Sequence, residues 1–320
     1  MNTPKRNERR PSSSDPRRRD QKKDFKHHDR QDPRRRPKGA STRFSPGPNR
    51  ARGRGDRAKV STSRSGWRIL HGINPLLEAL RAGRQIARVW VLAGAHGPEL
   101  RRVISVFRQR KTPLEEIDRN ALAELCQTPK HQGIAAEVEP LKNGSLTGLV
   151  KDHPDAPLTV LITDHIQDPQ NLGAIYRAAD AFGVQLVFVP AHDCCSHQLA
   201  SVSKASSGAV EHVPSVVVAE LRTAIAELKG HGFKLVGLEA EGSCPLEDAV
   251  TPRRLAIVVG SEGLGIAKSL AGLCDRQASI RTGGQVSSLN AAMACGIALY
   301  ERQRSLRQSI ANEQKASDTE

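Results

Sequence analysis

The strongest constraint on the fold is a series of short, continuously apolar segments that begins at Leu158. They occupy 158–163, 185–190, 234–240 and 255–261, and stretches with helical spacing of apolar residues lie between them. Strands that are apolar along their whole length are typical of parallel sheets covered by helices on both faces. The sequence therefore predicts an α/β domain over 157–306 with a mostly parallel sheet. Ligands of such sheets bind beyond the carboxyl ends of the strands.

A smaller α/β pattern over residues 66–140 precedes this domain. Its predicted elements are helices at 71–83, 99–111 and 120–126, a strand at 87–93 and a closing strand at 131–139. Residues 141–156 form a predicted linker with a surface helical turn, and 307–320 form a polar, frayed tail. Arginines of the small unit suit either RNA phosphates or an ordinary solvated helix face. They are Arg81, Arg84, Arg88, Arg101, Arg102, Arg108 and Arg110.

The first 65 residues differ from the rest of the chain in charge. They contain 22 lysines and arginines against 7 acidic residues, whereas residues 66–320 contain 27 of each. This segment is rich in Pro, Ser and Gly and has few large apolar residues, so we predict a disordered basic arm. Its charge favours RNA, through counterion release, over an acidic membrane surface, and its acidic residues argue against a targeting peptide. No stretch has the roughly 18 uninterrupted apolar residues of a membrane helix.

Six cysteines, at positions 126, 194, 195, 244, 274 and 295, form no Cys-x-x-Cys pair and no zinc-type cluster with histidines. The adjacent Cys194 and Cys195 are geometrically poor partners for a structural disulfide. We therefore expect reduced, mostly buried thiols, no metal and a cytoplasmic location.

The segment TDHIQDPQNLGAIYRAADAFGV, 163–184, presents polar groups where the first long strand ends. Asn171 either caps the following helix, by accepting from backbone N–H groups two or three residues on, or faces a substrate. Arg177 lies among apolar residues. It therefore either pairs with an acid such as Asp180 or directs its guanidinium at a phosphate or ribose.

Two further loops follow strands of the same domain. VVGSEGLGIAKSL, 258–270, has three glycines but matches neither a P-loop nor a G-x-G-x-x-G fingerprint, and Glu262 is its only acid. TGGQVSSLNAAMACGIALYE, 282–301, leads into an alanine-rich helix for which Ser288 is a candidate N-cap. The small residues of this helix imply that a second helix, a cofactor or a partner subunit packs closely against it.

Together the three loops resemble a known set of motifs. N-x-G-x-x-x-R-x-A at 171–179, G-x-E-G-x-G at 260–265 and S-L-N at 288–290 resemble those of the SpoU class of RNA ribose 2′-O-methyltransferases, the TrmH-like branch of the SPOUT superfamily. The resemblance covers about 157–305. HGINPLLEAL and KHQGIAAEVEP resemble the ends of the small RNA-binding domain, similar to ribosomal protein L30e, of the RlmB-type branch. KASSGAVEHVPSV, 204–216, also resembles that branch.

The resemblance implies a C-terminal trefoil knot that binds S-adenosylmethionine. By position in the motifs, the cofactor-binding residues are Leu238, Glu239, Ala240, Gly260, Ile280 and Leu289. Apolar Ile280 and Leu289 would flank the adenine, and backbone groups would give specificity. The catalytic residues implied are Asn171, Arg177, Glu262, Ser288 and Asn290.

Methyl transfer from a sulfonium to a ribose 2′-oxygen disperses positive charge, so it requires positioning, a dry site and loss of the hydroxyl proton. In this family the residue matching Arg177 is proposed to activate the 2′-hydroxyl. A free arginine, with a pKa above about 12, is a poor base, so we expect Arg177 to orient the hydroxyl and an adjacent phosphate. Asn171 and Asn290 would shape the substrate pocket, and Glu262 and Ser288 would hold the loops and Arg177 in place.

The sequence departs from the family at Ile280-Arg281-Thr282, where an I-P-M-type segment is usual. We expect this change to affect substrate contacts more than cofactor binding. Relatives are homodimers, so the resemblance implies a partner subunit as well as RNA. The expected target is a guanosine of large-subunit (23S) ribosomal RNA. A transfer RNA 2′-O-methyltransferase, or an RNA-binding ribosome-assembly protein without catalysis, are the alternatives.

Overall fold

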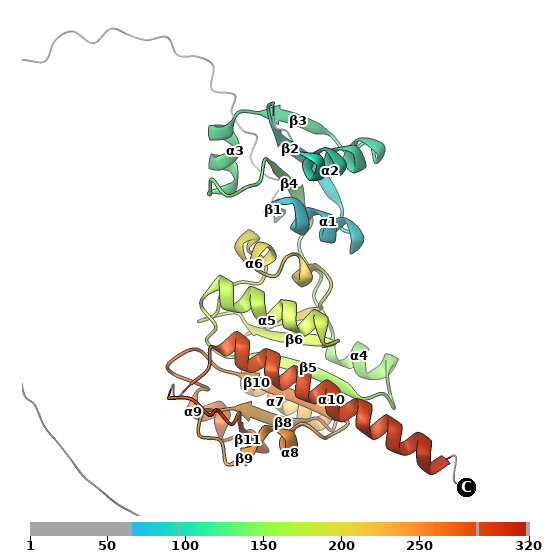
Figure 1. Ribbon diagram of the computed structural model, residues 1–320, viewed down its shortest axis with the longest axis vertical. Coiled ribbons are helices and arrows are strands. Elements are labelled where there is room, and N and C mark those ends of the chain that lie inside the picture. Colours follow the sequence, from blue (N-terminus) through green and yellow to red (C-terminus); the bar gives the residue numbers. More distant parts are fainter. Residues whose placement is uncertain (1–65, 95–96, 286–287, 318–320) are drawn as a thin grey trace, which may run out of the picture. The chain divides into compact units, whose positions relative to one another are not determined.

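The computed structural model describes residues 66–94, 97–285 and 288–317, all within one compact unit of the chain. The predicted disordered arm, 1–65, lies outside the described residues. The described part contains a four-stranded sheet and a seven-stranded sheet, each with helices packed against it (Figure 1). The predicted α/β class is therefore confirmed.

The four-stranded sheet belongs to the small domain. The elements of this domain are β1 (Arg68–His71), α1 (Ile73–Arg81), β2 (Ile86–Leu92), α2 (Pro98–Gln109), β3 (Leu114–Ile117), α3 (Arg119–Cys126) and β4 (Ile134–Val138). The strand order is β1-β4-β2-β3, and β4 pairs antiparallel with both neighbours. The sequence did not predict β1 and β3. Both are only four residues long, and the half-exposed LEEI of β3 shows no apolar alternation.

The seven-stranded sheet forms the core of the larger domain. After α4 (Leu146–Asp152) in the predicted linker come β5 (Leu158–Thr163), α5 (Pro169–Ala181), β6 (Leu186–Pro190), α6 (Ala200–Ala205), the 3-10 turn η1 (Ala209–Glu211), β7 (Ser215–Val218), α7 (Leu221–Gly230), β8 (Lys234–Leu238), β9 (Cys244–Pro245), α8 (Leu246–Ala249), β10 (Arg254–Val259), α9 (Lys268–Ala271), β11 (Arg276–Ser279) and α10 (Ala291–Ser317). The order is β7-β6-β5-β10-β8-β11-β9, and every pair is parallel.

Both faces of this sheet are buried, as the continuous apolar segments predict. Along β5, Leu161 packs into one core with α5, α8 and α10, whereas Val160 and Ile162 pack into a second core with α4, α7 and α9. Successive side chains of a strand point to opposite faces, so a strand buried on both sides must be apolar throughout. The trefoil knot remains a prediction from the resemblance.

The last helix is longer than predicted. α10 continues to Ser317, so most of the predicted polar tail is helical rather than frayed. The buried side chain of Arg302 fastens this helix to the amino ends of β5 and β10. Its guanidinium donates to the Thr159 hydroxyl at 3.1 Å and to the carbonyls of Val250 and Arg253 at 2.8 and 2.9 Å. Burial lowers the pKa of Arg302 to about 10.

All six cysteines are free, and three of them are buried. Burial raises the pKa of Cys295 to about 12 and that of Cys126 to about 11, so these thiols stay protonated near neutral pH. Within the described ranges, no helix combines the length and the apolar character that a membrane span needs.

Candidate active site

A cavity of about 510 Å³ lies beyond the carboxyl ends of β8, β10 and β11. Its walls include all six residues that the resemblance assigns to the cofactor, namely Leu238, Glu239, Ala240, Gly260, Ile280 and Leu289. They come from the ends of three neighbouring strands and from the segment before α10. This edge is where parallel sheets covered by helices bind ligands.

The loop after β10 folds tightly along one wall of the cavity. Ser261 and Gly265 exchange two backbone hydrogen bonds, at 3.2 and 3.0 Å. A Cβ on Gly260 would lie 2.2 Å from the carbonyl oxygen of Gly265, so only glycine fits there. The Glu239 carboxylate accepts from the Ile266 N–H at 3.2 Å and holds the far end of the loop. The buried Ser261 hydroxyl lacks a hydrogen-bond partner among the described residues, so it is available to a ligand.

Asn290 connects the three motifs at the rim of the cavity. Its amide nitrogen donates to the Asn171 side-chain oxygen at 2.9 Å and also to the Glu262 carboxylate. Residues from three distant parts of the chain thus meet through one amide group. Ser288 also lines the cavity, and its side chain is exposed.

The helix caps differ from the two that the sequence suggested. Asp168, not Asn171, caps α5 by accepting from the Gln170 N–H at 3.0 Å. Asn290, not Ser288, caps α10, because its side-chain oxygen accepts from the N–H groups of Ala292 and Met293. Capping therefore does not account for Asn171 or Ser288, which leaves both side chains to other uses.

Arg177 is exposed on α5. Like Asn171 on the same helix, it is not among the residues that line the cavity. The alternative pairing with Asp180 is absent, and within the described part of the chain Arg177 has no hydrogen-bond or ion-pair partner. A guanidinium without a protein partner is suited to an anionic ligand.

The departure from the family pattern touches the cavity directly. Arg281 and Thr282 are both exposed, and of the two only Thr282 lines the cavity. The expected effect on substrate contacts stays a prediction.

A buried acid that the sequence did not single out, Asp164, lies at the end of β5. One oxygen of Asp164, at the end of β5, accepts from the Ala267 N–H at 2.7 Å, and the other lies 2.6 Å from His165 Nδ1. The carboxylate joins the loop after β5 to the loop after β10, and His165 takes a positive φ of 55° to reach it. An acid directly after an apolar strand was the available signal. The described residues contain no cluster of three His, Cys, Asp or Glu side chains suited to a metal.

Both domains match known protein families. Residues 158–300 match the SpoU rRNA Methylase family. Residues 69–144 match the family described as RNA 2′-O ribose methyltransferase substrate binding.

Comparison with individual proteins agrees with these matches. A Staphylococcus haemolyticus (strain JCSC1435) protein assigned to the TrmH family of tRNA/rRNA methyltransferases is 33% identical over 242 residues, which cover 75% of this chain and 96% of that protein. A Staphylococcus aureus (strain COL) protein with the same assignment is 34% identical over 235 residues, covering 73% and 94%. These matches identify an RNA methyltransferase, and the chain belongs to the TrmH (SpoU) family of these enzymes.

Solved structures share the fold. The SpoU methyltransferase AviRb from Streptomyces viridochromogenes, in complex with the cofactor AdoMet, matches with a TM-score of 0.63 and 24% identity over 80% of this chain and 95% of that one. A structure described as an RNA 2′-O ribose methyltransferase matches with a TM-score of 0.64 and 24% identity over 75% and 89%.

Proposed function

We propose that this protein transfers a methyl group from S-adenosylmethionine to a ribose 2′-hydroxyl of RNA. The observation that carries the proposal is the meeting of Asn171, Glu262 and Asn290 at the rim of the cavity. The AdoMet complex of AviRb supports this choice of cofactor. The matched substrate-binding family supports ribose as the methylated group.

The cavity suits the cofactor in size and chemistry. Its volume lies within the range of about 300–1,000 Å³ that is usual for small-molecule sites. Apolar Leu238, Ile280 and Leu289 offer surfaces for an adenine, and the unpartnered Ser261 hydroxyl offers a polar contact. S-adenosylmethionine, when bound, supplies the methyl group on a positively charged sulfur.

The remaining motif residues position the RNA. Arg177 binds an RNA phosphate and orients the neighbouring 2′-hydroxyl, because its guanidinium is exposed and has no described protein partner. Asn290 holds the side chains of Asn171 and Glu262 in fixed positions around the reacting nucleotide. The hydroxyl proton is lost late, to water, so no strong base is needed.

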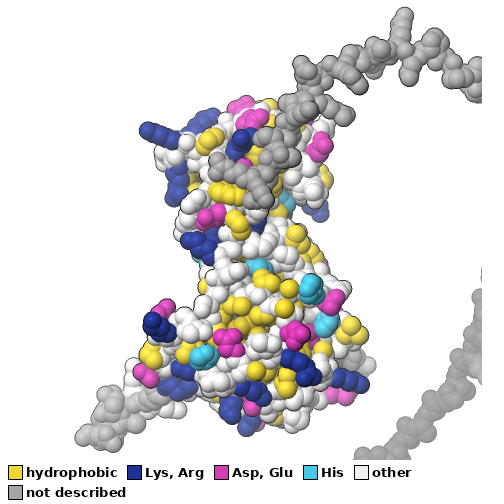
Figure 2. Space-filling view, turned by 180° about the vertical axis from the view of Figure 1, so that it is seen from behind, with side chains coloured by type: hydrophobic (Ala, Val, Ile, Leu, Met, Phe, Trp, Pro, Cys, Tyr) yellow, Lys and Arg dark blue, Asp and Glu magenta, His cyan; other side chains and the backbone are white. Residues whose placement is uncertain are grey.

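The small domain supplies a surface for the RNA backbone. Figure 2 shows basic side chains around the margins of this domain, and five of the seven arginines noted in the sequence are exposed (Figure 2). The exposed ones are Arg81, Arg101, Arg102, Arg108 and Arg110. Arg88 instead lies over the Trp90 ring, 5.7 Å from its centroid. We propose a guanosine of large-subunit ribosomal RNA as the target, because the small domain and the segment 204–216 resemble the RlmB-type branch.

A second copy of the chain is the expected partner. Met293, Ile297 and Tyr300 recur at helical spacing on α10 and are exposed, as is Leu264 in the neighbouring loop at 84%. An apolar stripe of this kind beside a site is typical of a subunit interface. Among the small residues that the sequence noted in this helix, Gly296 faces Ala178 of α5 within the same chain, whereas Ala291 and Ala294 line the cavity.

The test is methyl transfer from labelled S-adenosylmethionine to unmodified large-subunit ribosomal RNA and to unmodified transfer RNA, followed by mapping of the methylated position. We expect one 2′-O-methylguanosine in the ribosomal RNA. Methylation of transfer RNA alone would change the substrate but not the reaction. Cofactor binding measured by calorimetry, with no transfer to either RNA, would refute the proposed reaction on these RNAs. Failure to bind the cofactor would favour an RNA-binding protein without catalysis.

A further inference from the structure

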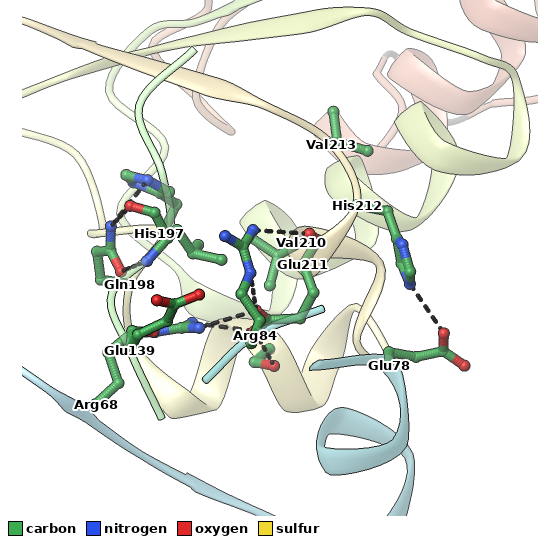
Figure 3. Close-up of polar contacts among 12 residues, drawn as sticks. Arg68, Glu78, Arg84, Glu139, His197, Gln198, Val210, Glu211, His212 and Val213 are labelled. Atoms are coloured by element: carbon green, nitrogen blue, oxygen red, sulfur yellow. Dashed lines mark hydrogen bonds and ion pairs between the residues drawn. The ribbon is translucent and has the colours of Figure 1, made fainter. Parts of the chain in front are cut away.

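One buried carboxylate, that of Glu211 in η1, joins the small domain to the methyltransferase domain (Figure 3). Its side chain is fully buried, at 0% exposure. Arg68 on β1 donates from both terminal nitrogens, at 3.0 and 2.8 Å, one to each carboxylate oxygen. Arg84, in the turn between α1 and β2, places Nε 3.3 Å from Oε2 and donates from Nη2 to the Glu211 carbonyl at 2.9 Å. We call these three residues the Glu211 cluster.

The Glu211 cluster neutralises a buried carboxylate and also constrains how the two domains are oriented. A bidentate arginine–carboxylate pair allows one relative orientation of its two planes. Arg68 is held in turn by the Glu139 carbonyl, at 3.2 Å, and Ser203 donates to the Glu211 carboxylate at 3.3 Å. The sequence left Arg84 as either a phosphate contact or a solvated side chain. The structure shows it instead inside the junction.

Another contact across the junction constrains the orientation of the small domain less tightly. His212 Nε2 lies 2.9 Å from a Glu78 oxygen, but both side chains are partly exposed. An exposed ion pair of this kind contributes little to stability or orientation. The buried bidentate pair therefore constrains the orientation of the small domain more tightly than this partly exposed pair does.

The segment that carries Glu211 also contacts the helix of the predicted active site. We call residues 200–212 the connector. On one side, a Cβ on Gly173 of α5 would lie 2.4 Å from the Ala205 Cβ. On the other side, a Cβ on Gly208, whose φ is +93°, would lie 2.5 Å from the Glu78 Cβ of α1. Glycines thus allow the connector to touch both the small domain and α5, which carries Asn171 and Arg177.

We propose that Glu211 is a positioning residue that fixes the orientation of the substrate-binding domain relative to α5, and so sets which nucleotide of a bound RNA reaches the methyl-transfer site. The inference rests on the proposed function. RNA held by the exposed arginines of α2 then presents to Arg177 only a nucleotide at a set distance from that contact. Without the Glu211 cluster, the cofactor cavity and the RNA-binding surface both stay intact, but their relative orientation is no longer fixed.

The first comparison uses Glu211→Gln, with Glu78→Gln as the matched control at the same junction. Methyl transfer is measured on a ribosomal RNA fragment that the wild-type enzyme modifies. For Glu211→Gln, kcat/KM for the RNA falls by about 10- to 100-fold, because misplacement by about 1 Å costs that much, while the Kd for S-adenosylmethionine is unchanged. Methylation also spreads to neighbouring nucleotides. For Glu78→Gln, the rate of methyl transfer and the methylated position stay as in the wild type, because only the partly exposed pair with His212 is lost.

A second variant separates positioning from stability. Replacing the whole cluster with apolar residues, as Arg68→Met, Arg84→Met and Glu211→Leu together, leaves no buried charge unpaired, and such exchanges are often neutral for stability. We expect this triple variant to melt near the wild-type temperature and yet lose rate and positional accuracy on the RNA. If it instead modifies a single position at the wild-type rate, the proposal is wrong. If Glu211→Gln does not fold, the rate and the methylated position of the triple variant test the proposal.

The two proposals fail differently. If the wild-type enzyme methylates no RNA, the proposed function fails, and small-angle X-ray scattering still tests the inference without RNA. The distribution of interatomic distances then broadens in the triple variant relative to the wild type. An unchanged distribution would show that the Glu211 cluster does not set the orientation of the domains.

Discussion

Asn290 performs two separable tasks, and one pair of substitutions divides them. Its side-chain oxygen caps α10 by accepting from two backbone N–H groups, at 3.0 and 3.1 Å. Its amide nitrogen donates to Asn171 at 2.9 Å and to Glu262. Alanine removes both functions, whereas aspartate keeps the acceptor and removes the donor.

The expected effects on stability differ between the two variants. Asn290→Ala loses the cap, which costs about 1 kcal/mol of the free energy of unfolding. Asn290→Asp keeps the cap and adds a negative charge at a helix amino end, worth about 0.5 kcal/mol. Repulsion from the exposed Glu262 offsets that gain, so the aspartate variant should be as stable as the wild type.

The expected effects on catalysis are the same for both variants. Each lacks the donor that keeps Asn171 and Glu262 in register, so kcat for methyl transfer should fall by about 100-fold in both. Urea unfolding gives the stabilities, and transfer of a labelled methyl group to RNA gives the rates. Wild-type turnover by the aspartate variant would show that Asn290 is only a helix cap and would refute the reasoning.

Four further predictions concern other parts of the chain. Arg177→Ala should change the free energy of unfolding by less than about 0.5 kcal/mol and lower methyl transfer by about 100-fold, so loss of the fold would show a structural role. Arg302→Met should cost about 3 kcal/mol in urea unfolding, at roughly 1 kcal/mol for each of its three shortest hydrogen bonds, and an unchanged midpoint would contradict this. Burial lowers the native pKa of His71 and His197 to about 4, below the ordinary value of 6.5. The unfolded chain therefore binds protons first as the pH falls below about 6.5, and acidification from pH 7 to 5 should cost about 2 kcal/mol per histidine, seen as a lower melting temperature at pH 5. Deleting residues 1–60 should flatten the dependence of RNA affinity on salt, because fewer counterions are released, and an unchanged slope would mean that the arm does not touch RNA.

Local patterns in the sequence were sufficient to predict the edge of the sheet where the cavity lies, whereas the individual residues came from the resemblance. Leu238 ends one apolar strand and Gly260 follows another, and parallel pairing brings the carboxyl ends of such strands to one edge. Helix ends were less well predicted, although the signal was present for α5. Asp168 directly precedes Pro169, and an acceptor followed by proline at the first helical position is a known helix start.

The buried charges could not be predicted, and they explain how the domains are joined. Rules for single sequences place Arg and Glu at the surface, because an unpaired charge is costly to bury. Arg68 and Glu211 offset this cost chiefly by pairing with each other, across 143 residues of chain, and no periodic pattern reports such a pair. Resemblance marked the segment 204–216 without giving it a role. In the structure, that segment brings Glu211 to two arginines and Gly208 to α1. The contacts that composition rules exclude are therefore those that join the small domain to the connector.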